Sequence, residues 1–109
     1  MISPRFIQSR ADAIMAQCGG VPTRAARANP TPATKVAMLA YDAQFTLNFA
    51  RDEMWFIRHY APGPLASFEW AYRAYASKRR IARACIRSAG RKLSEAEEML
   101  AQLSVRDAA

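Results

Sequence analysis

The sequence contains few of the residues that build metal sites and redox centres. Its 109 residues include two cysteines, Cys18 and Cys85, and a single histidine, His59. A zinc site of the Cys/His kind needs four such ligands, and one chain supplies too few of them unless carboxylates contribute. The cysteines do not form a C-x-x-C pair. We expect them to be reduced thiols of a cytoplasmic protein, with a single disulfide as the alternative.

Other functional signatures are absent as well. No apolar run approaches the roughly 20 residues that cross a bilayer, and the first ten residues lack the apolar segment of a secretory signal. Glycine-rich phosphate loops, EF-hand loops and H-E-x-x-H patterns are missing. Asp52 and His59 share one side of a predicted helix, but seven residues of helix separate their Cα atoms by about 10 Å. We therefore expect no catalytic site, cofactor or metal ion.

Positive charge, in contrast, is abundant. Lys and Arg number 16 against 9 Asp and Glu, which gives a net charge of +7. Such an excess favours anionic partners: nucleic acid, acidic protein surfaces or anionic lipid. Most of these bases are arginine, and a GC-rich coding bias would raise arginine and alanine together. The distribution of the charge is therefore more informative than its total.

The length corresponds to one domain, expected to span 1–109. Apolar residues recur at helical spacing in four segments, no segment alternates as a strand would, and no heptad is sustained. The first helix is predicted over 4–17, with Ser3 as its N-cap. The second, over 33–60, is apolar around most of its circumference, which is typical of a buried central helix. The large residues expected on its buried side are Met38, Phe45, Phe49 and Phe56.

The third helix is predicted over 65–89 and ends at Gly90. The fourth begins at Ser94, which forms a capping-box spacing with Glu97. Short connections between these helices favour antiparallel neighbours. The expected fold is all-α, a compact bundle of about four helices with two long central antiparallel helices. The wide apolar surface of the long helices is also compatible with a homodimer that shares one core.

Residues 19–34 hold two glycines and three prolines and are expected to form a connector, either irregular throughout or with a short helix over 22–29. In the second case, 12–29 resembles the turn of a bacterial repressor-type helix-turn-helix. That resemblance implies that Arg24, Arg27 and Asn29 face a DNA groove. The Asn29-Pro30 pair departs from the pattern, because it stands where the second helix needs an apolar anchor and more length.

A run of basic residues without any acid separates Glu69 from Glu95. Three arginines in it repeat every seven residues and share one arc of a helix, so they form a ridge roughly 20 Å long. A helix face that only contacts solvent usually carries charges of both signs. A face of arginines alone suits phosphate binding, because each guanidinium group can form two hydrogen bonds to a phosphate. The candidate nucleic-acid-binding residues are Arg73, Lys78, Arg79, Arg80, Arg83, Arg87, Arg91 and Lys92, with Arg24 and Arg27 from the connector.

Two functions follow as hypotheses. The first is a small basic helical protein that binds DNA or RNA mainly through backbone phosphates, alone or within a nucleoprotein complex. The second is a protein-interaction module, an inhibitor or adaptor of the size that phages and plasmids encode. It would dock on an acidic partner through the same ridge, or through Tyr41, Trp55 and His59, since Trp and Tyr are enriched at binding hot spots.

Overall fold

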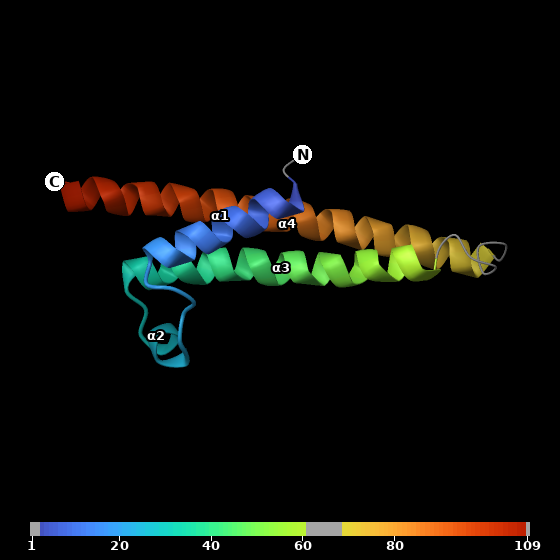
Figure 1. Cartoon of the computed structure of the whole chain (residues 1–109), viewed down its shortest axis with the longest axis horizontal. Helices are drawn as coiled ribbons and strands as arrows, with labels where there is room; N and C mark the ends of the chain where they lie inside the picture. Colours follow the sequence, from blue (N-terminus) through green and yellow to red (C-terminus); the bar gives the residue numbers. More distant parts are fainter. Residues whose placement is uncertain (1–2, 61–68, 109) are drawn as a thin grey trace.

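The protein is built from helices packed side by side (Figure 1). The computed structural model describes residues 3–60 and 69–108, with side chains for 3–55 and 73–105. Four helices make up the secondary structure of this part: α1 (Pro4–Gln17), α2 (Arg24–Ala28), α3 (Pro32–Tyr60) and α4 (Glu69–Ala108). The prediction of an all-α bundle with two long antiparallel helices is confirmed.

Helix α1 has the predicted bounds because its ends are chemically marked. The Ser3 Oγ accepts a hydrogen bond from the Phe6 amide at 3.2 Å, and Pro4 occupies the first turn, where its missing N–H is harmless. After the helix, Gly19 and Gly20 adopt φ angles of 94° and 95°, a left-handed conformation that other residues rarely adopt. These two glycines turn the chain towards α2.

Helices α3 and α4 form a long antiparallel pair, and α1 lies across only part of it (Figure 1). The part that α1 covers contains the start of α3 and the second half of α4, far from the end of α3 and the start of α4 (Figure 1). The molecule measures 62 × 29 × 16 Å between Cα extremes, with a radius of gyration of 17.6 Å. A globular chain of this length has a radius of about 13 Å, so a large share of this protein's surface remains outside any core.

The third and fourth predicted helices are one continuous helix, and this corrects the sequence-based boundary. Helix α4 runs through Gly90 and Ser94 without a break, so Gly90 is not a stop and Ser94 is not an N-cap. Ala89 and Leu93 on either side of the glycine are buried. A helical glycine costs about 1 kcal/mol relative to alanine, which is less than the loss of a buried leucine from the contact with α3.

The contact between α3 and α4 follows a heptad alternation that alanine conceals in the sequence. Buried positions on α3 are spaced by four and three residues, and α4 shows the same spacing. Small side chains at most of these positions let two helices approach closely. From α1, Ile7, Ala11, Ile14 and Met15 complete the core. The buried residues with this spacing are Val36, Ala40, Ala43, Leu47 and Ala50 on α3, and Ala82, Ala89, Leu93 and Ala96 on α4; Ala37 on α3 is buried as well.

The aromatic side of α3 is not in the core, contrary to the sequence-based expectation. Phe45 is 66% exposed and Phe49 is 49% exposed, while Met38 is half-buried. The Phe56 side chain lies outside the described residues. Helix α3 therefore has two apolar faces, and α1 and α4 cover the one made largely of alanine, because that face permits the closer approach.

Replacing Gly90 with alanine should stabilise the protein. A Cβ at this position would meet nothing within 4 Å, so only the gain in helix propensity remains. We expect Gly90→Ala to raise the free energy of unfolding by about 0.5–1 kcal/mol, measured by urea denaturation with an unchanged m-value. The control is Gly20→Ala, which should destabilise by about 1 kcal/mol because φ there is 95°. A destabilised Gly90→Ala would mean that α4 is not a regular helix at this residue.

Truncating Leu93 should test whether α4 is continuous. Its side chain is 2% exposed, although the sequence places it in a connection between helices. We expect Leu93→Ala to lower the free energy of unfolding by about 2–5 kcal/mol in the same assay. The neighbouring Ser94→Ala serves as the control. Replacing a mid-helix serine with alanine should leave the free energy of unfolding unchanged or raise it slightly, whereas replacing an N-cap serine would lower it by about 1 kcal/mol. A costly Ser94→Ala would contradict the continuous helix.

Candidate functional site

The outward side of α4 carries a dense group of arginines, here called the arginine surface: Arg79, Arg80, Arg83, Arg87 and Arg91. All five side chains are exposed. Within the part of the chain that the structure describes, none of them forms an ion pair or a side-chain hydrogen bond. Twelve residues of helix separate the first from the last, or about 18 Å. Arg73 is also exposed on this side of α4 and extends the positive charge towards the helix start.

Part of the arginine surface is concave. A hollow of about 380 Å³ is lined by the guanidinium-bearing side chains of four arginines together with Tyr75 and Ala76. Tyr75 is half-buried, so its ring forms part of the wall without projecting into solvent. Several guanidinium groups around one concavity repel each other, and that repulsion is relieved when an anion binds between them. The four arginines are Arg79, Arg80, Arg83 and Arg87.

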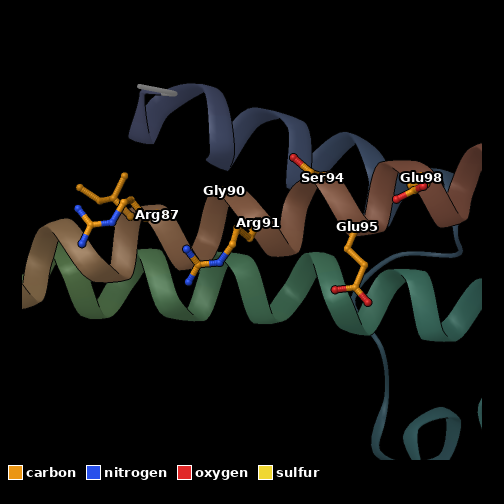
Figure 2. Close-up of a pocket in the computed structure, with 7 residues that line it drawn as sticks. Arg87, Gly90, Arg91, Ser94, Glu95 and Glu98 are labelled. Atoms are coloured by element: carbon orange, nitrogen blue, oxygen red, sulfur yellow. The ribbon is translucent and has the colours of Figure 1, made fainter.

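The arginine surface ends where the charge on α4 changes sign. A second groove, of about 560 Å³, runs along α4 from Arg87 and Arg91 to Glu95 and Glu98 (Figure 2). Gly90 lies in the groove and leaves it open, because it has no side chain. The two glutamates repel phosphate, so a polyanion on α4 would contact the helix from Arg73 to Arg91 and no further.

The two lysines among the candidate residues have partners inside the protein. Lys78 Nζ lies 3.0 Å from a carboxylate oxygen of Glu53, and Lys92 Nζ donates a hydrogen bond to Thr46 Oγ1 at 3.0 Å. Both contacts join α4 to α3. Since Glu53 is largely buried, its pairing with Lys78 also neutralises a charge that would otherwise be poorly solvated. These lysines fix the register of the helix pair.

The arginines of the connector lie apart from the arginine surface. Helix α2 lies on the opposite side of α3 from α4 (Figure 1). Arg24 is exposed, while the Arg27 guanidinium stacks over the Tyr41 ring, 4.8 Å from its centroid. With only five residues and no buried side chain, α2 is too short and too exposed to be the second helix of a helix-turn-helix, so that resemblance does not extend to the structure.

The aromatic partner-binding residues expected on α3 do not form one open patch. Tyr41 is half-buried under Arg27, and the side chain of His59 lies outside the described residues. Trp55 is 54% exposed. Sequence reasoning missed Phe45 and Phe49, the exposed aromatic residues between them. The sequence did contain a signal that some of these aromatic residues are exposed. Helix α3 is apolar on two sides, and packing against one layer of helices covers only one side.

Groups for other chemistry are sparse in the described chain. Cys18 and Cys85 are free and half-buried, and burial raises the pKa of the Cys18 thiol, which disfavours the reactive thiolate. Among the described residues, no three His, Cys, Asp or Glu side chains are grouped to hold a metal ion. In the same residues, no helix combines the length and apolarity needed to cross a membrane.

Comparison with known proteins supplies no ligand for this surface. No protein-family model matches the chain, and neither a curated protein nor a solved structure shows significant similarity to it. The geometry of the helices and the charges they carry are therefore the basis for assigning a function.

Proposed function

We propose that the protein binds nucleic acid through backbone phosphates at the arginine surface of α4. The observation that supports this most directly is the set of five exposed arginines with no partner among the described residues. Surface bases on helices commonly pair with acids three or four residues away. Here no acid lies within four residues of Arg79, Arg80, Arg83 or Arg87, and Arg91 forms no ion pair with Glu95 four residues on, so the charges stay available to an external anion.

The spacing of the arginines suits a phosphate backbone. One strand of a duplex presents a phosphate about every 3.4 Å along the helix axis. The roughly 18 Å between Arg79 and Arg91 therefore corresponds to about five phosphates. Arginine is also the base best suited to this task, because its planar fork forms two parallel hydrogen bonds to a phosphate.

The chemistry of the surface favours binding with little sequence preference. Phosphate contacts position a protein on nucleic acid, whereas sequence is distinguished by side chains that reach the base edges. The arginine surface lies along a single helix, Glu95 and Glu98 adjoin it at one end, and no second recognition element accompanies it in the described chain. An acidic protein surface is the alternative ligand for the same arginines, and the experiment below separates the two.

Binding should depend steeply on salt and on the arginines of α4. We would titrate fluorescently labelled single- and double-stranded DNA and RNA of 20 nucleotides with the protein and follow anisotropy. Neutralising about four phosphates gives a log–log salt slope near −3, so affinity should fall roughly 100-fold between 50 and 200 mM salt. The variant Arg80→Glu/Arg83→Glu/Arg87→Glu should lose at least about 100-fold at 50 mM salt.

A matched charge variant controls for net charge alone. Arg5, Lys35 and Arg51 are exposed and lie outside the arginine surface. Their replacement by glutamate removes the same charge and should weaken binding far less. No binding of any of the four polymers by folded wild-type protein would refute the proposal, as would equal losses in the two triple variants. Polyglutamate that binds as tightly, with the same arginine dependence, would show that the surface recognises acidic polypeptides.

A further inference from the structure

A second surface of the molecule is apolar and lies away from the arginines. Phe45 and Phe49 are one helical turn apart on the outer side of α3. Phe45 lies about 160° around the helix from the buried Leu47. On α4, Ile81 is 40% exposed. Ile81 follows Lys78 by three residues and Phe49 precedes Glu53 by four, so the Lys78–Glu53 ion pair places Ile81 and Phe49 at a similar height along the antiparallel helices. We call Phe45, Phe49 and Ile81 the apolar patch.

The apolar patch lies on the side of the helix pair that α1 leaves uncovered. Helix α1 meets α3 through Gln44, whose amide donates hydrogen bonds to Asp12 and to the Gln8 carbonyl. The contacts of α3 with Lys78 and Lys92 lie about 160–180° around α3 from Gln44. The patch borders these lysine contacts. The described chain therefore has a three-helix core on one side of α3 and exposed phenylalanines on the other.

We propose that the apolar patch is the interface between two copies of this chain, related by a two-fold axis parallel to α3 and α4. The charges around the patch select a second copy as the occupant. Its α3 side carries the exposed acids Asp42 and Asp52. Its α4 side carries Lys78 and Lys92, which contact Glu53 and Thr46 of their own chain but stay partly exposed, so their charge also acts on a neighbouring copy. Such an axis sets α3 of each copy against α4 of the other, so acids face lysines twice.

The heights of these charges along the bundle agree with this arrangement. The Lys78–Glu53 contact places Asp52 at the level of Lys78, and the Lys92–Thr46 contact places Asp42 within about one turn of Lys92. Pairing α3 with α3 of the other copy would instead bring aspartates together. The arginine surface points away from Ile81 around α4, so two chains of net charge +7 meet without bringing these arginines into contact.

The size of the patch fits a reversible dimer. A fully exposed aromatic side chain offers about 150–250 Å². At the observed exposures, Phe45, Phe49 and Ile81 supply roughly 250–350 Å² per copy, about half of the 600 Å² per partner at the lower end of specific interfaces. The flanking charged and polar residues supply the rest. The two aspartates make this face less favourable than the arginine surface for nucleic acid or anionic lipid.

Sedimentation equilibrium of the full chain would test the interface. At about 100 µM the wild-type protein should have twice the 12.2 kDa chain mass and should dissociate on dilution. The variant Phe45→Ser/Phe49→Ser should be monomeric at the same concentration, with unchanged helix content by circular dichroism. Phe6→Ser is the matched control, because Phe6 is 49% exposed like Phe49 but lies on α1, and it should leave the dimer intact. A monomeric wild type would refute the proposal, as would equal weakening by Phe6→Ser.

A charge variant tests the two-fold arrangement without altering the phenylalanines. Asp42→Lys/Asp52→Lys places lysines against lysines and should raise the dimer dissociation constant at least about tenfold, with the effect reduced at high salt. If α3 packed on α3 of the other copy, the same change would replace repulsion between aspartates with a similar repulsion between lysines, and the dissociation constant would stay nearly unchanged. The single variant Asp52→Asn distinguishes the two: it should weaken the proposed dimer and strengthen the α3–α3 alternative.

Discussion

The close packing of α3 against α4 through alanine is the constraint on which the rest of the molecule depends. Ala40 and Ala43 on one helix and Ala89 and Ala96 on the other are fully buried. Small side chains at heptad positions bring the helix backbones together and leave no room for phenylalanine between them. The bulky residues of α3 are consequently directed outwards, and the same contact keeps α4 helical through Gly90.

A straight, unbroken α4 is what gives the protein a continuous charged side. Because the heptad positions face α3, the arginines at intervening positions face solvent from Arg79 to Arg91. The two lysines near the contact with α3 turn inwards instead, one to Glu53 and one to Thr46. The position of each base on the helix thus decides its contacts: the two lysines at the edge of the helix pair contact α3, and the arginines on the outer side are exposed without a partner among the described residues.

The elongated shape links the two proposed surfaces. A chain of 109 residues drawn out to 62 Å buries a thin core, so apolar side chains are left outside it. The patch formed by Phe45, Phe49 and Ile81 is the part of this apolar surface that lies opposite α1. A dimer through that patch would place an arginine surface on each outer flank, so the two proposed interactions would use different sides of the same pair of helices.

Local chemistry determined much of what the sequence alone predicted. The bounds of α1 depend on neighbouring residues, namely the Ser3 cap and the glycine pair that follows the helix. The helical character of α3 and the run of bases from Arg73 to Lys92 are likewise visible in the local sequence. Tertiary contacts decided the rest. Whether Gly90 ends a helix, which face of α3 is buried and which bases are paired depend on residues far away in the sequence, since burial against α3 outweighs the modest penalty of one helical glycine, and alanine packs closer than phenylalanine.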